Sequence, residues 1–314
     1  LSIGGCIFLC ATYMVESLKV HAELSLISDD GLGSEYRISL KSDSLKDTIP
    51  EAVADKIKNM PETENVYATK YTMGELQISK NEFLSEEEWS DYLKYQNQEP
   101  YYIQRYDGIC KQQEDGNYRI KYNVYGYDEA MIEQLRDFIL EGEIQPETIK
   151  NNNQVIVTAN MDGQGNYFFY GKKPGDTITL RVPKTENYTD ELLKFHSGEE
   201  NYIEKEFEIA AIVNRPLAQE KDFLNTEVWK NAQSVIMTGE QMEENFGITD
   251  YSFINASPAD SADAKIVSNQ LLQVIRDVPK AVLQDHTTAI ATQKGYLGQQ
   301  QIFFSSIAVI LLII

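Results

Sequence analysis

Histidine, serine and cysteine, the side chains that most often carry catalysis or hold transition metals, are too scattered in this chain to build a site. His21, His196 and His286 lie far apart, and there is no HExxH, no paired-histidine zinc spacing, no G-x-S-x-G elbow and no P-loop. Carboxylates abound, but among 49 acidic residues their pairing carries no weight for acid–base catalysis. We therefore expect no catalytic, metal-binding or cofactor-binding residue and no enzymatic activity. An extracellular hydrolase that uses acidic residues is the alternative.

One segment places oxygen-bearing side chains at alternate positions, as a calcium-binding loop does. It runs Asn160-Met161-Asp162-Gly163-Gln164-Gly165-Asn166, with glycine in the sixth position. The twelfth position is Gly171, where a calcium loop has a bidentate glutamate. We interpret the segment as a glycine-rich turn, and calcium binding is the alternative.

Residues 81–116 are polar, acidic and rich in tyrosine. One interpretation is a surface insertion with a short helix around Trp89. The other is a contact surface for a partner, because tyrosine offers an apolar ring and a polar hydroxyl together. The candidate contact residues are Tyr92, Tyr95, Tyr101, Tyr102 and Tyr106.

Both ends of the sequence are apolar and uncharged. Residues 1–15 and 302–314 contain no charged side chain, and about 20 apolar residues are needed to cross a bilayer. We expect these runs to be parts of two transmembrane helices. A signal-peptide core is the alternative for the first run, and a buried helix is the alternative for the second.

The charge between these runs favours a location outside the cytoplasm. Every charged residue lies between Glu16 and Gln301, and the net charge is −21. So acidic a surface repels nucleic acid and anionic lipid headgroups, and lysine-rich and arginine-rich segments tend to stay in the cytoplasm. Cys110 is the only cysteine of this segment, so no disulfide is expected within it.

Hydrophobic periodicity predicts an α+β fold, with a mixed α/β core and a β-rich subdomain, flanked by partial transmembrane helices. The expected strands cover residues 36–40, 65–79, 117–125, 154–158, 176–182, 205–213, 234–238 and 252–255, and the expected helices cover 44–60, 128–140 and 262–278.

These elements predict five consecutive segments. They are 1–28, the end of a transmembrane helix and a stalk; 29–160, an α/β extracytoplasmic subdomain with the acidic, tyrosine-rich insertion at 81–116; 161–250, a β-rich subdomain; 251–295, a return to the α/β subdomain; and 296–314, a second stalk and the start of the next transmembrane helix. A domain held between two stalks would pass movement from one stalk to the other.

Six phrases follow one another along the chain. They are Leu1-Ser2-Ile3-Gly4-Gly5-Cys6-Ile7-Phe8-Leu9, Tyr125-Gly126-Tyr127-Asp128, Leu140-Glu141-Gly142-Glu143-Ile144, Gln154-Val155-Ile156-Val157-Thr158, Lys173-Pro174-Gly175-Asp176-Thr177-Ile178-Thr179-Leu180 and Phe207-Glu208-Ile209-Ala210-Ala211-Ile212-Val213. In this order they resemble the large extracellular loop of FtsX-like ABC transporter permeases, including MacB-type and Bce-type proteins, together with the membrane helix before it. Residues 81–116 and 184–202 depart from the family's pattern and leave the ligand open.

The resemblance implies a domain outside the cell membrane that carries motion across it and is not itself an enzyme. It implies two partners, a separate ABC ATPase subunit and a second permease copy or half, and no nucleic acid. The ligand could be a peptide, a lipoprotein, an antibiotic or a wall enzyme. A ligand-sensing or wall-hydrolase-regulating ectodomain without transport is the alternative.

Overall fold

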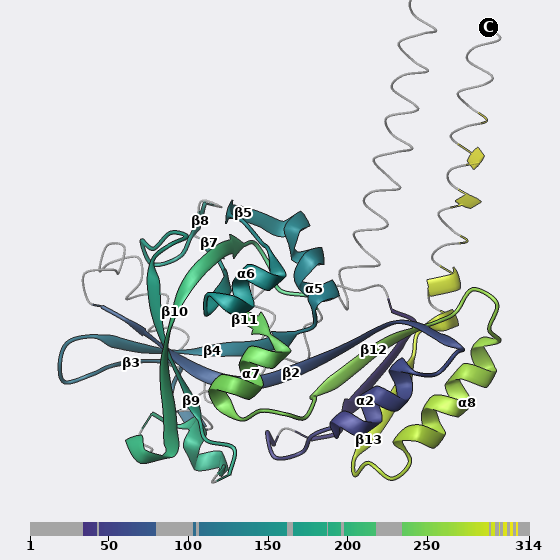
Figure 1. Cartoon of the computed structure of the whole chain (residues 1–314), viewed down its shortest axis with the longest axis horizontal. Helices are drawn as coiled ribbons and strands as arrows, with labels where there is room; N and C mark the ends of the chain where they lie inside the picture. The colour runs from purple at the N-terminus through teal and green to yellow at the C-terminus, as the bar shows by residue number, and fades with distance from the viewer. Residues whose placement is uncertain are drawn as a thin grey trace, which may run out of the picture.

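The structure is a computed structural model. It describes residues 34–42, 44–79, 103–104, 107–161, 166–186, 188–195, 198–217 and 234–288, and short stretches between 290 and 306. Within these residues an α/β sheet with two helices, on the right of Figure 1, adjoins a β barrel on the left. This arrangement confirms the predicted α+β class.

The first unit, called the α/β unit below, is an antiparallel sheet in the order β13-β1-β12-β2. Its elements are β1 (Tyr36–Leu40), α2 (Glu51–Lys58), the first half of β2 (Thr63–Ile78), β12 (Phe253–Pro258), α8 (Ala264–Ile275) and β13 (Ala281–Asp285). One helix joins β1 to β2 and the other joins β12 to β13, which is a split β-α-β arrangement. Both helices pack on the sheet face that presents Tyr36, Ile38 and Ile254.

Helix α2 is shorter than the helix predicted over residues 44–60. Pro50 lies within that range, and a proline disfavours helical backbone in the residue before it. Ile49 is accordingly extended and bridges Tyr251, and the helix begins at Glu51 with Pro50 as its N-cap.

The second unit, called the barrel below, is a closed ring of six strands in the described part of the chain. They are the second half of β2, β4 (Tyr118–Tyr127), β11 (Ser234–Thr238), β6 (Gln154–Thr158), β10 (Tyr202–Val213) and β9 (Thr177–Pro183). The ring closes because β2 pairs with both β4 and β9. Closure removes the exposed edges that an open sheet would present.

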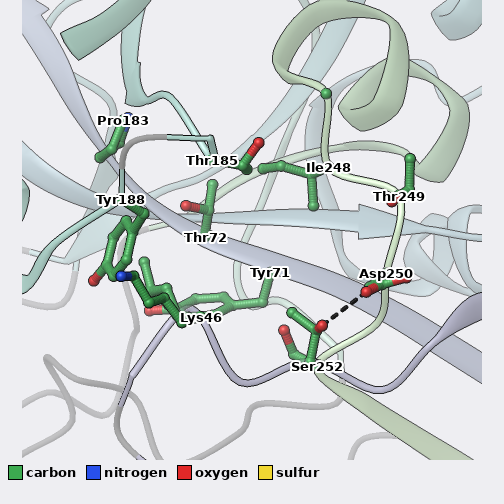
Figure 2. Close-up of a pocket in the computed structure, with 13 residues that line it drawn as sticks. Lys46, Tyr71, Thr72, Pro183, Thr185, Tyr188, Ile248, Thr249, Asp250 and Ser252 are labelled. Carbon is green, nitrogen blue, oxygen red and sulfur yellow. Dashed lines mark hydrogen bonds between the residues drawn. The ribbon is translucent and has the colours of Figure 1, made fainter.

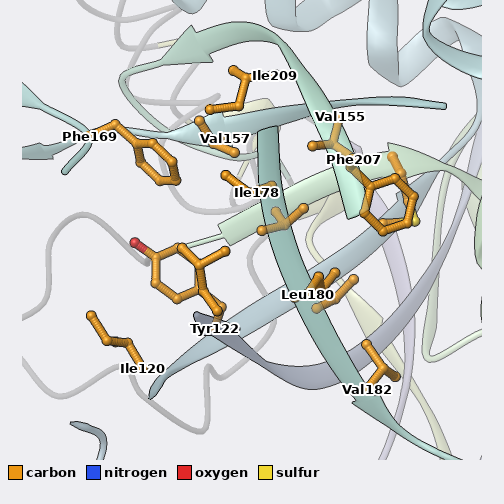
Figure 3. Close-up of a cluster of buried hydrophobic side chains, with 14 of the residues drawn as sticks. Ile120, Tyr122, Val155, Val157, Phe169, Ile178, Leu180, Val182, Phe207 and Ile209 are labelled. Atoms are coloured by element: carbon orange, nitrogen blue, oxygen red, sulfur yellow. The ribbon is translucent and has the colours of Figure 1, made fainter. Parts of the chain in front are cut away.

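Alternation along the barrel strands fills its interior with apolar side chains. On β4, Ile120 and Tyr122 point inward, where Leu180 and Phe207 meet them (Figure 3), and Val124 belongs to the same buried cluster. Helix α7 (Gly239–Phe246) adds Met242 and Phe246 to the same cluster and packs against β4. Its fit is tight, because a Cβ at Gly126 would lie 2.5 Å from Cγ of Met242.

The outer wall of the barrel carries further elements. They are β3 (Cys110–Gln112) beside β4, α5 (Glu129–Gln134), η2 (Leu135–Phe138), β5 (Ile139–Gly142) beside β10, α6 (Pro146–Asn151), the hairpin of β7 (Asn160–Met161) and β8 (Tyr167–Phe168), η3 (Asp190–Leu193) and η4 (Glu199–Asn201). Of the helix predicted over 128–140, α5 covers Glu129–Gln134 and continues as the 3₁₀ helix η2, which ends at Phe138 because Ile139 and the residues after it pair with β10.

The barrel takes its strands from both predicted subdomains, 29–160 and 161–250. Strands β2, β4 and β6 precede residue 160, whereas β9, β10 and β11 follow it. Alternation identifies strands but does not name their partners, so the closure of the ring was not predicted. Strand β13, which falls inside the predicted return at 251–295, pairs with β1.

The two ends of the α/β unit are hydrogen-bonded neighbours. Tyr36 at the start of β1 pairs with Asp285 at the end of β13, and the amide of His286 donates to the carbonyl of Glu35 at 2.8 Å. The chain therefore enters the folded domain and leaves it at one place. No described helix is both long and apolar enough to cross a membrane, and the flanking transmembrane segments remain a prediction.

We predict that Gln284→Pro frays the pairing of β1 with β13. Antiparallel amides alternate in direction, so the amide of Gln284, like that of His286, faces β1, whereas the amide of Asp285 faces away. The loss of one ladder bond, worth about 1 kcal/mol, should speed amide hydrogen exchange in β1. Asp285→Pro is the matched control. Equal exchange in the two variants would contradict the assigned bond direction.

Candidate functional site

A cleft of about 380 Å³ lies at the seam between the α/β unit and the barrel (Figure 2). Its lining residues come from the loop before α2, from β2, from the segment after β9 and from the link between α7 and β12. They are Leu45, Lys46, Thr48, Tyr71, Thr72, Pro183, Thr185, Tyr188, Gly247, Ile248, Thr249, Asp250 and Ser252. Seven of them carry a hydroxyl, so the cleft offers many groups that both donate and accept hydrogen bonds.

Strand β2 forms the floor of the cleft. Residues 63–69 pair with β12, and residues 75–77 pair with β9. Residues 70–74 lie between these two partners and, among the described strands, pair with β4 alone. Tyr71 and Thr72 therefore face the cleft from a stretch that is bonded at one edge.

The loop of residues 44–48, called the strap below, crosses from the α/β unit toward the barrel. Asp47 accepts hydrogen bonds from Lys280, at 2.6 Å, and from Ser42, which anchors the strap in the α/β unit. These bonds, first that of Lys280, lower the pKa of Asp47 below its usual value of 3.8. Leu45 packs on the barrel's outer cluster, which contains Met73 and Tyr188.

The link between α7 and β12, residues 247–252, carries the chain from the barrel back to the α/β unit. It begins at Gly247, whose φ of +69° favours glycine, and ends where the Ser252 amide donates to the Thr69 carbonyl at 2.9 Å. The Thr48 hydroxyl donates to Asp250 at 2.8 Å, the dashed line of Figure 2. Ile49 and Tyr251 also exchange two backbone bonds, so the link is fastened to the α/β unit.

A buried ion triad supports the barrel wall beside the cleft. Glu75 binds Lys121 at 2.5 Å and Arg181 at 2.7 Å, and all three side chains are almost fully buried. Lys121 lies 4.2 Å from the ring centre of Phe195, and Arg181 lies 3.5 Å from that of Tyr202. Desolvation lowers the pKa of Lys121, while the Glu75 carboxylate opposes that shift. The triad thus contacts residues 188–195 through Phe195, and this segment supplies Tyr188 to the cleft.

None of the candidate contact residues predicted from the sequence is among the described residues that line this cleft. Tyr92, Tyr95, Tyr101, Tyr102 and Tyr106 lie outside the described residues, and their role as a contact surface stays a prediction. His21 and His196 also lie outside them, as does the middle of the glycine-rich turn at 162–165. Within the described ranges no group of three or more histidine, cysteine or carboxylate side chains could hold a metal ion.

Sequence reasoning missed the residues that build the seam, although some left a signal. Thr238 and Gln241 form a capping box, which marks the start of α7, and Gly247 ends it in the left-handed conformation. Together these signals would have indicated from the sequence where α7 ends and the link begins. No local signal announces Thr48, Asp250 or the triad, because their partners are distant in sequence.

We predict that Glu75→Gln destabilises the chain strongly. The substitution leaves Lys121 and Arg181 buried without their counter-charge, and removal of one partner from a buried ion pair costs about 3–5 kcal/mol. Urea unfolding would measure the loss. Glu199→Gln is the control, because Glu199 is exposed where it binds Arg119 and should contribute little. Similar unfolding midpoints for the two variants would show that the triad does not hold the wall.

We predict that Lys280→Met raises the pKa of Asp47 toward 3.8. A lowered folded-state pKa stabilises the protein above the ordinary pKa, and the gain is lost as the pH falls through the folded-state value. The free energy of unfolding of the wild type should therefore exceed that of the variant at neutral pH, by less than about 1 kcal/mol because the pair is so exposed. In acid the two free energies should be equal. Carboxyl-detected NMR titration and urea unfolding at both pH values would measure this, with Lys265→Met as the control. A stability difference that persisted in acid would contradict it.

Comparison with known proteins gives similarities of structure. No protein-family model matches the sequence, and no curated protein matches it. The periplasmic region of MacB from Actinobacillus actinomycetemcomitans aligns at 9% identity and a TM-score of 0.45, covering 84% of this chain and 94% of that one. The extracellular domain of the noncanonic ABC-type transporter YknZ from Gram-positive bacteria aligns at 10% identity and a TM-score of 0.41, covering 80% of this chain and all of that one. Both similar structures are extracytoplasmic domains of ABC-type transporters, the class of protein named by the predicted resemblance.

Proposed function

We propose that this chain is the extracytoplasmic domain of an FtsX-like ABC transporter permease of the MacB or Bce type. In this role it couples ATP hydrolysis by a partner ATPase to export or to conformational work outside the membrane, and it catalyses no reaction itself. The observation that carries the proposal is the pairing of β1 with β13, which brings the entry and exit of the folded domain together.

Two ends at one place suit a domain inserted between two membrane segments. Beyond Glu35 toward the N-terminus, and beyond His286 toward the C-terminus, the sequence leads to the uncharged apolar runs 1–15 and 302–314. Helices that crossed the membrane side by side would connect to such a domain through the two predicted stalks. The proposal therefore places the α/β unit on the membrane side of the domain, with the stalks between it and the membrane.

The sheet of the α/β unit supplies a route for movement. A displacement that enters through β13 and β1 passes by hydrogen bonds to β12 and then to β2. Strand β2 continues into the barrel, where it pairs with β4 and β9. Movement at the ends would thereby reach the barrel, where the proposal places contact with a ligand, a second permease copy or a wall enzyme.

We predict that surface positions of both units are accessible from outside intact cells. Lys56 on α2 and Glu204 on β10 are exposed. In the full-length protein with Cys6→Ala and Cys10→Ala, Lys56→Cys and Glu204→Cys should each react with a membrane-impermeant maleimide before permeabilisation. Cys110 is buried, and burial raises the pKa of its thiol to about 12, so background labelling should stay low. Labelling after permeabilisation gives the reference.

The same cells test the partner. We expect an ATPase with a P-loop to copurify with the tagged full-length protein and to hydrolyse ATP in the complex. Labelling that required permeabilisation would place the domain in the cytoplasm and overturn the proposal. External labelling without any copurifying ATPase would leave an extracytoplasmic domain and overturn the transporter part.

A further inference from the structure

The seam between the α/β unit and the barrel has a packed base and a hollow above it. At the base, the tilted rings of Tyr71 and Tyr125 have centres 5.3 Å apart, and Phe253 joins them in one apolar cluster. Tyr71 also lines the cleft of about 380 Å³, so this cluster adjoins the floor of the cleft. Packed aromatic groups resist separation, whereas a hollow with polar walls does not.

In the described part of the chain, two stretches pass between the two units, and both line the cleft. The chain enters the barrel along β2, past Tyr71 and Thr72, and it returns through the link of residues 247–252. Residues 70–74 of β2 pair with β4 alone among the described strands. The link is bonded to the α/β unit, and it leaves the barrel at Gly247 in the left-handed conformation. A strand bonded at one edge and a turn at a glycine are places where the backbone absorbs changes of φ and ψ.

The strap lies along the cleft and contributes residues to its lining. Asp47 holds it to Lys280 in the α/β unit, and Leu45 reaches the outer cluster of the barrel with Tyr188. The apolar contact of Leu45 is therefore a contact that opening of the cleft must break. The bond between Thr48 and Asp250 fastens the strap to the link at the same mouth.

We propose that the seam is a latched hinge. The α/β unit rotates against the barrel about the aromatic cluster of Tyr71, Tyr125 and Phe253, and the mouth of the cleft above this cluster opens and closes. The strap acts as the latch, because the packing of Leu45 on the barrel holds the closed arrangement. Any ligand or force that favours the open or the closed arrangement shifts the balance between them. The hinge is a property of the domain itself and holds whether or not the chain serves a permease.

Pulsed electron–electron spin resonance on the full chain tests the hinge. Spin labels at Lys56→Cys in the α/β unit and Glu204→Cys in the barrel report the angle across the seam, with Cys6→Ala and Cys10→Ala as the background. Labels at Glu204→Cys and Glu244→Cys, both within the barrel and its helix α7, give the width expected of a rigid body. The distribution of distances should be broader for the pair of labels across the seam than for the pair within the barrel.

Truncation of the Leu45 side chain should then favour the open arrangement of the hinge. We expect Leu45→Ala to raise the open fraction, seen as a longer distance across the seam, by about tenfold. Leu40→Ala is the matched control, because Leu40 packs within the α/β unit and does not cross the seam. Thr48→Val, which removes the bond to Asp250 and keeps the side-chain volume, gives a second and milder test if Leu45→Ala folds poorly.

Three results would overturn the hinge. One is a distribution across the seam as narrow as that within the barrel, in wild type and in both strap variants. Another is equal broadening by Leu40→Ala, which would indicate general loosening of the α/β unit. The third is broadening by Leu45→Ala of the pair within the barrel, which would place the disorder there and not at the seam.

Discussion

The rest of the structure depends on one strand that belongs to two sheets. Strand β2 has 16 residues and a length of roughly 50 Å at 3.3 Å per residue. Its first half pairs with β12 in the α/β unit, and its second half pairs with β4 in the barrel. The two units are thus joined by continuous extended backbone as well as by side-chain packing. A shift of β2 in either sheet must appear in the other, because the strand cannot slide in one half alone.

The buried ions on the outer face of β2 set its register in the barrel. Glu75 lies opposite Lys121 on β4 and opposite Arg181 on β9, so one carboxylate aligns three strands. A slip of one residue would turn Glu75 into the apolar interior, where Leu76 now lies. Buried ion pairs add little net stability over apolar packing, but a misplaced partner is costly. The triad therefore acts mainly against wrong pairings of β2, which a strand with so many partners would otherwise permit.

The sequence was informative where local patterns decide the structure. Alternation and short buried-type apolar runs located β1, β2, β4, β6, β9, β10, β11 and β12, and helical spacing located α8. The sequence patterns misplaced the ends of helices where a single residue or a distant partner determines the structure. Pro50 shortens the helix predicted over 44–60, and pairing with β10 makes the end of the helix predicted over 128–140 into β5. Closure of the barrel rests on pairs such as Glu75 with Arg181, 106 residues apart, and no local pattern contains them. The cleft has the same origin, since its walls come from four separate segments.

The pairing of β1 with β13 also restricts the kind of movement that the domain can receive. Pulling the two ends apart would load the bond between His286 and Glu35 first and then the next pairs in turn, and bonds that are loaded one at a time give way easily. Moving both ends together leaves those bonds unstrained and displaces the whole sheet of the α/β unit. Such a joint displacement meets the barrel at residues 70–74 of β2, which among the described strands pair at one edge alone. Movement of the ends as a pair is therefore the input that the fold transmits intact, and the seam is where that input becomes a change of angle.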